Sequence, residues 1–206
     1  MNIINKDTKI YGSFSSNPGN NGCIYFNSRF EVEGINAIYK SFYSDNIKKS
    51  VIAAKTLNFS GFAISMPFKE EVLNLVDIID PAAKEIGAAN TVINNNGFLK
   101  AFNTDWMGIY NFFKDTNLKH VNIIGTGGFA KAIVYAFNEL GMTFSIVTRS
   151  EIPSIDEVSD QYFINATPTE IISEKNTIFD GRPFTGVGRV VAELQAEEQY
   201  KLYINA

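Results

Sequence analysis

The chain has 206 residues, of which 45% are hydrophobic and 19% are charged, and its formal net charge is −4. This is an ordinary globular composition, with enough residues for one large domain or two small ones. No run of Lys or Arg exceeds two residues and no apolar run approaches the ~20 residues of a membrane span, so we expect neither a nucleic-acid nor a membrane partner.

The cysteine and histidine content is low. A single cysteine, Cys23, cannot form an internal disulfide, which fits a reducing cytoplasm. The first ten residues are polar and show no secretory signal. With one histidine, His120, far from Cys23 in sequence, we expect no metal site.

The first hundred residues alternate strand-like and helix-like segments. We predict strands at 8–14, 37–42 and 61–65, and helices at 23–33, at 47–57 after a cap at Ser44, and after Pro67. Residues 91–93 and 98–102 flank Asn94-Asn95-Asn96-Gly97, which is a hairpin signal. This alternation predicts a mostly parallel sheet with helices on it.

The second half carries one clear strand-helix-strand unit. We predict a connecting helix at 106–113, a buried strand at 121–124, a helix at 130–140 that Gly141 ends, and a strand at 143–147. Short strands at 162–165 and 177–179 follow, and a closing helix is predicted at 187–203.

A glycine-rich loop joins the strand at 121–124 to the helix that follows. Gly125-x-Gly127-x-x-Ala130 fits the dinucleotide fingerprint with alanine last. The first glycine permits a tight turn, the second lets the backbone approach a pyrophosphate, and the small third residue packs helix on strand. The alternative is a glycine-rich turn in another α/β protein, but the strand before it and the helix after it favour a dinucleotide site.

The next strand ends at Thr148-Arg149-Ser150. An enzyme that uses NAD usually has Asp or Glu here, whereas an arginine suits the 2′-phosphate of NADP. Thr148 and Ser150 add hydroxyl donors, so the sequence favours NADP as cofactor. Against this stand a purely solvated Arg149 and the neighbouring Glu151, which would partly neutralise it.

Lys69 and Asp105 lie ahead of this loop, in Ser65-Met66-Pro67-Phe68-Lys69 and Asn103-Thr104-Asp105. In a hydride-transfer enzyme such a pair handles the proton while the cofactor handles the hydride. Taken alone, a lysine and an aspartate are more often surface residues or a helix N-cap.

The sequence motifs around these residues are similar to those of the shikimate dehydrogenases. Ser65 to Lys69 resembles their Val-Thr-Val-Pro-Phe-Lys stretch, and the matching sequence motifs follow in the family's order from residue 8 to residue 199. The other matching motifs are Gly87–Thr91, Asn103–Asp105, Gly125–Ala130, Thr148–Ser150, Asn165–Pro168 and Gly188–Ala196.

The resemblance implies reversible reduction of 3-dehydroshikimate by NADPH, in the chorismate pathway of aromatic amino acid biosynthesis. Lys69 would hold and protonate the developing alkoxide, and Asp105 would orient that lysine. The implied substrate ligands are Ser65, Asn90, Thr104, Gln195 and Asn20. The implied cofactor ligands are Gly125, Gly127, Gly128, Ala130, Thr148, Arg149, Ser150, Asn165, Thr167 and Gly188.

The chain departs from the family in a substrate-binding motif within its first thirty residues. The family carries Ser-x-Ser-Pro, whose hydroxyls grip the substrate carboxylate, and the corresponding residues here are Asn20, Asn21, Gly22 and Cys23. Asn20 can still donate through its amide, and Ser13, Ser15 and Ser16 lie upstream. This pattern resembles the shikimate dehydrogenase-like branch, where shikimate or a relative such as quinate is the expected substrate.

The second departure is length. One strand-helix-strand unit takes ~30 residues or more, so the 86 residues from Val121 to Ala206 cannot hold a six-stranded dinucleotide fold and a closing helix. We expect about four strands with poorly covered edges. An exposed sheet edge can pair with another chain, which leaves a homodimer open.

The predicted fold class is therefore α/β, with an N-terminal α/β substrate domain, a reduced Rossmann-type NADP-binding domain and a closing C-terminal helix. We place the substrate domain at 1–104, with helix 187–203 packing back on it, and the cofactor domain at 105–186. Two other readings stay open: a metabolite-binding protein of this fold with little turnover, and a relative among folate or amino-acid dehydrogenases.

Overall fold

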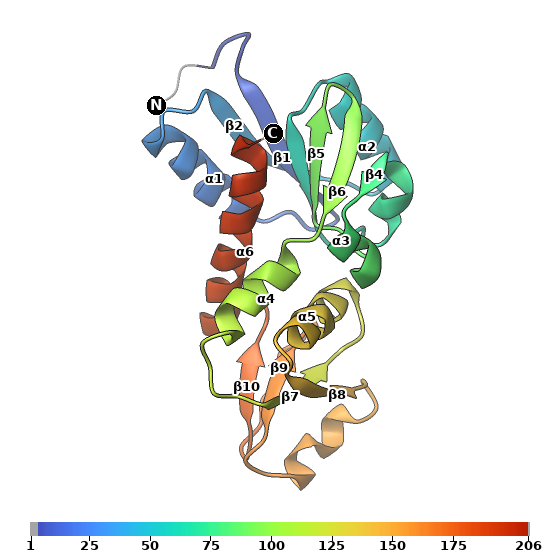
Figure 1. Ribbon diagram of the computed structural model, residues 1–206, viewed down its shortest axis with the longest axis vertical. Helices are drawn as coiled ribbons and strands as arrows, with labels where there is room; N and C mark the ends of the chain where they lie inside the picture. Colours follow the sequence, from blue (N-terminus) through green and yellow to red (C-terminus); the bar gives the residue numbers. More distant parts are fainter. Residues whose placement is uncertain (1–3, 206) are drawn as a thin grey trace. The chain divides into compact units, whose positions relative to one another are not determined.

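The computed structural model describes residues 4–205 and divides into two compact units (Figure 1). Unit 1 runs as far as Thr104 and also contains the chain from Gln199 onward. Unit 2 runs from Asp105 to Glu198. Each unit has its own sheet and its own apolar core.

Unit 1 is built on a six-stranded sheet of order β2-β1-β3-β5-β6-β4. All neighbouring strands are parallel except β5, which runs antiparallel to β3 and β6. The carboxyl ends of β1, β2, β3 and β6 therefore lie at one edge. The elements are β1 (Lys9–Ser15), α1 (Asn21–Val32), β2 (Ala37–Tyr43), α2 (Ile47–Thr56), β3 (Gly61–Ile64), η1 (Glu71–Leu75), β4 (Ile78–Ile79), α3 (Pro81–Ile86), β5 (Thr91–Asn95) and β6 (Phe98–Phe102).

Alternate residues of β1 supply two different cores, because successive strand side chains point to opposite faces. Phe14 packs with Val51 of α2 and with Phe62, in a cluster that contains no residue of α1. Tyr11, on the other face, packs its ring against Phe30 of α1 and against Tyr203 near the C-terminus. Helices thus cover both faces of the β1–β3 half of this sheet.

Unit 2 holds a four-stranded sheet of order β10-β9-β7-β8, in which all strands are parallel. Helices α4 and α5 share a core with β7, in which Phe113 meets Phe137 edge-on at 5.1 Å between ring centroids. The elements are α4 (Asp105–Phe113), β7 (His120–Ile124), α5 (Gly128–Glu139), β8 (Thr143–Val147), η2 (Ile152–Glu157), β9 (Tyr162–Asn165), β10 (Thr177–Asp180) and α6 (Gly186–Ile204).

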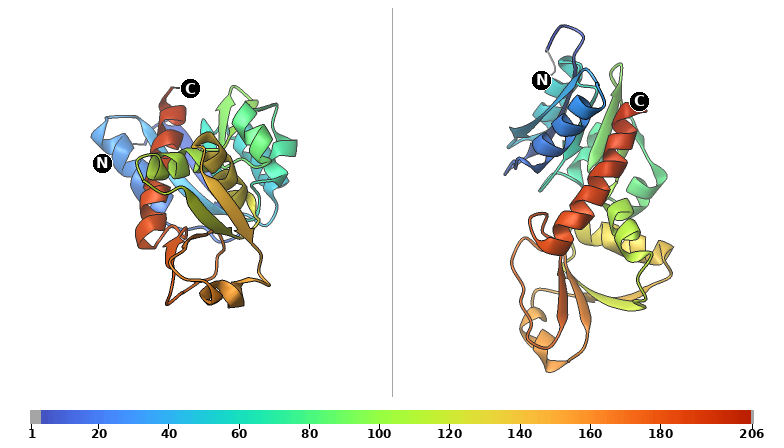
Figure 2. Two further views of the ribbon diagram at one scale, coloured as in Figure 1. Left: turned by 60° about the horizontal axis from the view of Figure 1, so that its bottom comes forward. Right: turned by 90° about the vertical axis from the view of Figure 1, so that its left-hand side faces the viewer.

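Helix α6 is one continuous helix, which is easily followed in the right-hand view of Figure 2. Its residues as far as Glu198 belong to unit 2, where Val191 enters the core, and its last turns belong to unit 1. The α/β fold class and the four-stranded second sheet are confirmed, as are the hairpin, the strand-helix-strand unit and the closing helix.

The helix predicted after Pro67 is wrong. Residues 67–70 form turns, and only a 3₁₀ helix, η1, follows. The Lys69 carbonyl accepts the amide of Ala89 at 2.8 Å, so it is not available to the amide four residues on. Without that bond an α-helix cannot propagate through this segment.

Sequence reasoning also misplaced one cap and missed three short elements. The cap of α2 is Asn46, whose Oδ1 accepts the Lys49 amide at 3.0 Å, and not Ser44. The elements β4, α3 and η2 were not predicted, since each has only two to six residues and therefore shows little periodicity.

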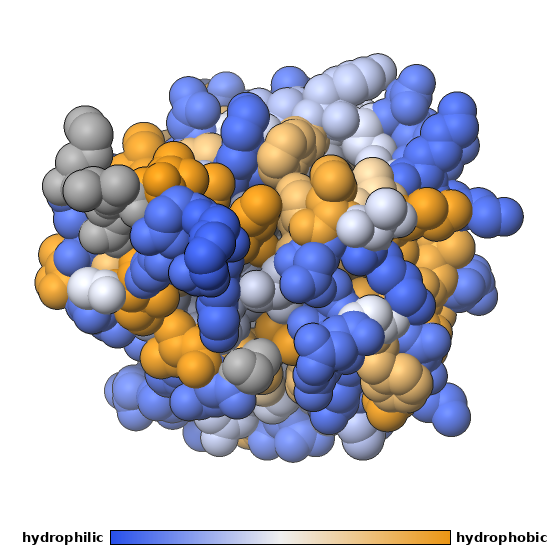
Figure 3. Space-filling view, turned by 90° about the horizontal axis from the view of Figure 1, so that it is seen from above, coloured by the Kyte–Doolittle hydropathy of each residue, from blue (hydrophilic) through white to orange (hydrophobic). Residues whose placement is uncertain are grey.

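None of the helices described within residues 4–205 is long and apolar enough to cross a membrane. Figure 3 shows apolar side chains scattered among polar ones on one face of the molecule. In the same part of the chain, no group of three His, Cys, Asp or Glu residues is placed to hold a metal ion.

Helices α4 and α6 approach closely within unit 2 at Gly108. A Cβ atom at Gly108 would lie 2.8 Å from the Val191 carbonyl oxygen and 3.0 Å from the Gln195 amide nitrogen. Both are backbone atoms, which cannot rotate away as a side chain can. Glycine is therefore required at this crossing.

Gly108→Ala is expected to lower the free energy of unfolding by about 1–3 kcal/mol, because overpacking must push the two helix backbones apart. Gly186→Ala is the control, since nothing lies within 4 Å of a Cβ atom there. Urea denaturation followed by circular dichroism measures both. Equal stability of the two variants would contradict the proposed contact.

Candidate active site

The loop from Ser65 to Lys69 follows β3 at the carboxyl edge of the unit 1 sheet. The Ser65 amide donates to the Phe14 carbonyl at 3.0 Å, and the Ser16 amide donates to the Met66 carbonyl at 3.2 Å. The Lys69 carbonyl accepts the Ala89 amide. The loop is therefore fixed between the end of β1 and the segment that precedes β5, with Lys69 half-buried and Ser65 exposed.

A buried group of polar side chains lies beside this loop. The Oδ1 atom of Asn90 accepts the Thr104 amide at 2.8 Å and the Thr91 hydroxyl at 3.0 Å, and Nδ2 of Asn90 donates to Thr104 Oγ1 at 3.0 Å. All three residues are less than 5% exposed. Buried polar side chains that are fully hydrogen-bonded to one another fix a single local conformation.

We call this buried group of Asn90, Thr91 and Thr104 the Asn90–Thr104 corner. Asn103 lies beside it and donates from Nδ2 to the Ala88 carbonyl at 2.9 Å. The next residue after Thr104 is Asp105, which is the first residue of α4 and only 6% exposed. A carboxylate in the first turn of a helix is favoured by the helix dipole. Asn103-Thr104-Asp105 thus links the buried corner of unit 1 to the start of unit 2.

The predicted substrate ligands are divided between the units. Lys69, Asn90 and Thr104 lie at the carboxyl edge of the unit 1 sheet, whereas Asp105 and Gln195 belong to unit 2. Within unit 2, Gln195 lies on α6 beside Gly108 of α4. The pairing of Lys69 with Asp105 stays a prediction.

The segment that replaces the family's Ser-x-Ser begins α1. Asn20 is exposed, and its carbonyl accepts the Ile24 amide at 3.0 Å. Gly22 does not have a positive φ, but a Cβ atom there would lie 3.0 Å from the Tyr39 ring and 3.2 Å from the Tyr39 hydroxyl. Tyr39 thus occupies the space that a second serine would need.

Unit 2 presents the glycine loop between β7 and α5. Gly125 has a φ of +115°, and a Cβ atom there would lie 3.2 Å from the Thr167 methyl group. Gly127 precedes α5 directly and has nothing within 4 Å of a Cβ position, while Ala130, in the first turn of α5, is buried. Thr126 and Gly127 are exposed residues just before a helix N-terminus, where the first backbone N–H groups have no partner within the helix, and this arrangement fits a dinucleotide pyrophosphate.

The loop after β9 lies against the glycine loop. The Ala166 amide donates to the Ile124 carbonyl at 2.9 Å. The buried Asn165 side chain accepts from the Thr167 amide at 2.9 Å and donates to the Thr169 carbonyl at 2.8 Å. Asn165 therefore organises its own loop, and the Thr167 side chain contacts Gly125.

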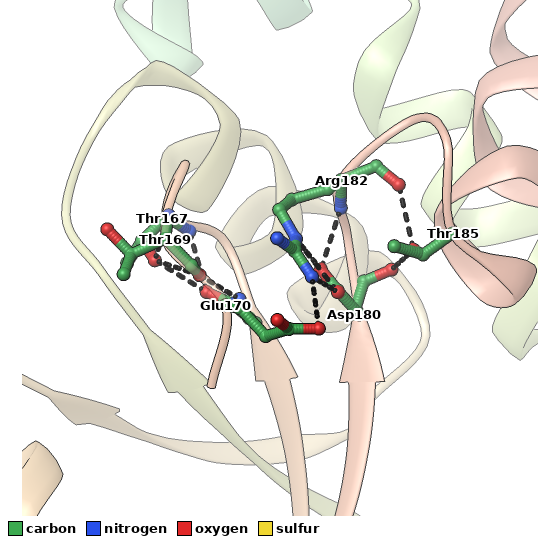
Figure 4. A network of polar contacts seen from close by, with 7 residues as sticks. Thr167, Thr169, Glu170, Asp180, Arg182 and Thr185 are labelled. Atoms are coloured by element: carbon green, nitrogen blue, oxygen red, sulfur yellow. Dashed lines mark hydrogen bonds and ion pairs between the residues drawn. The ribbon is translucent and has the colours of Figure 1, made fainter. Parts of the chain in front are cut away.

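An ion-pair network lies between the loops that follow β9 and β10 (Figure 4). The Arg182 guanidinium contacts both carboxylate oxygens of Asp180, and its Nη2 atom also contacts Glu170 at 3.1 Å. A Cβ atom at Gly188 would collide with the Arg182 carbonyl oxygen. The geometry at Gly188 thus shows a close backbone approach between α6 and this loop.

The end of β8 holds Thr148, Arg149 and Ser150, all exposed. The Glu151 carboxylate accepts both the Thr148 hydroxyl, at 2.6 Å, and the Thr148 amide, at 2.8 Å. Both bonds hold the pKa of the Glu151 carboxyl below its ordinary value, and the bond from the hydroxyl has the larger effect. The sequence showed Glu151 beside Arg149, but gave no signal that it would turn back on Thr148.

The fold and these two edges define a class of protein: a two-unit α/β protein with a polar, lysine-containing corner in one unit and a dinucleotide-type loop in the other. Two family models match the chain. A model described as the shikimate dehydrogenase substrate binding domain matches residues 22–92, and one described as NADP oxidoreductase, coenzyme F420-dependent, matches residues 120–206.

The chain is similar in sequence to shikimate dehydrogenases and to shikimate dehydrogenase-like proteins. It is 40% identical, over 142 residues, to a shikimate dehydrogenase-like protein of Haemophilus influenzae, covering 68% of this chain and 52% of that protein. It is 29% identical over 190 residues to the shikimate dehydrogenase (NADP(+)) of Aquifex aeolicus, covering 86% and 66%. The matches thus span about half to two thirds of these relatives.

A solved structure of a shikimate 5-dehydrogenase-like protein is similar throughout. It superposes with a TM-score of 0.82 at 28% identity, covering 99% of this chain and 94% of that one. The predicted family resemblance is therefore confirmed. The roles of the individual site residues stay predictions.

Asn90→Leu is expected to lower the free energy of unfolding by about 1–3 kcal/mol, because it leaves the buried Thr104 amide without its acceptor. The matched control is Asn95→Leu at the far end of β5, the strand that Asn90 directly precedes. Asn95 is exposed, so this change should alter stability by less than about 0.5 kcal/mol. Chemical denaturation of both variants measures the difference. If the Asn90 variant were as stable as the Asn95 variant, the buried hydrogen bonds of Asn90 would make no measurable contribution to the free energy of unfolding.

Proposed function

We propose that this chain is an NADP-dependent oxidoreductase that interconverts 3-dehydroshikimate and shikimate, or a close cyclic hydroxy acid such as quinate. The observation that carries the proposal is the contact between the Lys69 loop and the buried Asn90–Thr104 corner, through the Ala89 amide. A Lys69 side chain directed toward this corner would bring a cation next to hydrogen-bonding groups that suit a polyhydroxylated ring. The names of the two relatives support the same reaction.

The chemistry needs a group that stabilises an oxyanion. Hydride addition to a ring carbonyl produces an alkoxide, and the Lys69 ammonium would stabilise this charge and then give it a proton. Asp105 would orient the lysine and accept a substrate hydroxyl. Asn90, Thr104, Gln195 and Ser65 would bind the remaining ring hydroxyls, and Asn20 the carboxylate.

The cofactor would bind to unit 2, and NADP would supply the hydride when bound. Gly125, Gly127, Gly128 and Ala130 would hold its pyrophosphate at the start of α5, in keeping with the open backbone there. Thr148, Arg149 and Ser150 would meet the ribose 2′-phosphate. Asn165, Thr167 and Gly188 would shape the edge nearest the glycine loop.

A second candidate function is binding without turnover. It is favoured by the unit 2 sheet, which has four strands where a full dinucleotide fold has six. Purified chain, 3-dehydroshikimate and NADPH decide between the two functions. Oxidation of NADPH supports the enzyme, whereas ligand binding measured by calorimetry with no oxidation supports the binding protein.

Lys69→Ala is expected to lower kcat by a factor on the order of 10²–10⁴, the usual contribution of a positioned proton donor. Lys84→Ala, which removes an exposed lysine of α3, is the control for the loss of one positive charge. Steady-state NADPH oxidation measures both, with circular dichroism to verify the fold. A Lys69 variant with most of its activity would refute the catalytic assignment.

Arg149→Ala is expected to weaken NADPH binding roughly tenfold or more, because a charge-assisted hydrogen bond is worth ~1.5–3 kcal/mol. NADH binding should barely change, since NADH has no 2′-phosphate. Fluorescence titration of the two reduced cofactors compares the losses. Equal weakening of both would show that Arg149 acts on something other than the 2′-phosphate.

A further inference from the structure

We propose that Glu151 is a specificity-determining residue, whose carboxylate weakens binding of a ribose 2′-phosphate at the end of β8 and favours a ribose 2′-hydroxyl. The proposal rests on the proposed function, because it assumes that a nucleotide binds to unit 2. It assigns the balance between NADP and NAD to two neighbouring side chains of opposite charge, Arg149 and Glu151.

The first step is the geometry of Glu151. Its Oε2 atom receives both donors that Thr148 offers, the amide and the hydroxyl. The Ser150 hydroxyl lies 3.0 Å from the Thr148 hydroxyl, so it joins the same network. The strand end thus already holds an anion, supplied by the protein itself.

The second step is the local backbone that brings Glu151 there. The Glu151 amide donates to the Thr148 carbonyl at 3.0 Å, which closes a turn directly after β8. The chain then enters the 3₁₀ helix η2 instead of a long crossover helix. The turn folds the Glu151 side chain back over the strand end.

The third step is the position of this turn beside the glycine loop. The Gly125 amide donates to the Val147 carbonyl at 3.1 Å, and Val147 is the residue directly before Thr148. In this architecture the dinucleotide runs from the glycine loop to the end of the second strand, where its adenosine ribose lies. The Glu151 carboxylate therefore occupies the ribose end of the candidate site.

The last step is charge. A carboxylate at this strand end accepts a ribose hydroxyl but repels a 2′-phosphate, which carries up to two negative charges. The hydrogen bonds from Thr148 favour the ionised form of Glu151, so the repulsion is present at neutral pH. Arg149 acts in the opposite direction. The pair therefore predicts weaker discrimination between NADP and NAD than Arg149 would give alone.

Isothermal titration calorimetry with adenosine 2′,5′-bisphosphate and with 5′-AMP tests the proposal without any turnover. Glu151→Gln removes the charge but keeps an oxygen that can accept from Thr148, at an exposed position. We expect the variant to bind the bisphosphate roughly tenfold more tightly, because a like charge at the ribose end of the candidate site is gone. The affinity for 5′-AMP should stay the same or fall.

Glu139→Gln is the matched control, since it removes one negative charge at the far end of α5 from the glycine loop. The proposal is overturned if Glu151→Gln leaves the bisphosphate affinity unchanged or lower, if it tightens both ligands equally, or if Glu139→Gln has the same effect. Failure of both ligands to bind any of the proteins would overturn the nucleotide site, and the proposed function with it. Selective tightening in a chain that never oxidises NADPH would leave Glu151 its role and remove only the oxidoreductase.

Discussion

The buried residue Asn90 is the constraint on which the candidate site of unit 1 depends. The backbone carbonyl of Asn90 accepts the Ile64 amide, and its backbone amide donates to the Phe102 carbonyl. Asn90 therefore joins the end of β3 to the end of β6. Its side chain then fixes Thr104, the last residue before α4. One residue therefore positions both the exit of β3, which leads to Lys69, and the exit of β6, which leads to Asp105.

Unit 2 replaces regular elements with short polar networks. Where a full dinucleotide fold would have crossover helices, the loops after β9 and β10 are held by the buried Asn165 side chain and by Arg182 between two carboxylates. Such networks hold one geometry only while every member has its partner, because an unpaired polar group in a buried position is costly. Specific polar contacts thus hold these two loops in place.

Local signals predicted those elements in which the backbone itself is the determinant. Asn96-Gly97 predicted the hairpin, and both residues have positive φ, as the tight turn requires. Gly125, which also has a positive φ, predicted the tight turn of the glycine loop in unit 2 for the same reason. Contacts between distant segments were out of reach: nothing near Lys69 indicates that its carbonyl goes to Ala89, and nothing near Gly22 indicates that Tyr39 fills its neighbourhood.

The same limit applies to the candidate site. The order of the motifs predicted Lys69, Asn90 and Asn103-Thr104-Asp105 as site residues, and their roles stay predictions. In unit 1, Lys69 follows β3, Thr104 follows β6, and Asn90 directly precedes the antiparallel strand β5, so the three lie at one edge of the sheet. The sequence could not show that Asn90 and Thr104 bind one another, or that Glu151 closes on Thr148, since both depend on turns whose geometry appears only in the folded chain.

The last turns of α6 have a consequence for the order in which the chain folds. Tyr203 packs on Tyr11 and Phe26, accepts the Tyr11 hydroxyl through its carbonyl, and covers the bare backbone at Gly61. On a ribosome, the first hundred residues emerge long before these turns do. The part of one face of the first sheet that lies around Tyr11 and Gly61 therefore stays uncovered until these turns have been synthesised, a period in which exposed aromatic surface is open to aggregation or to chaperones.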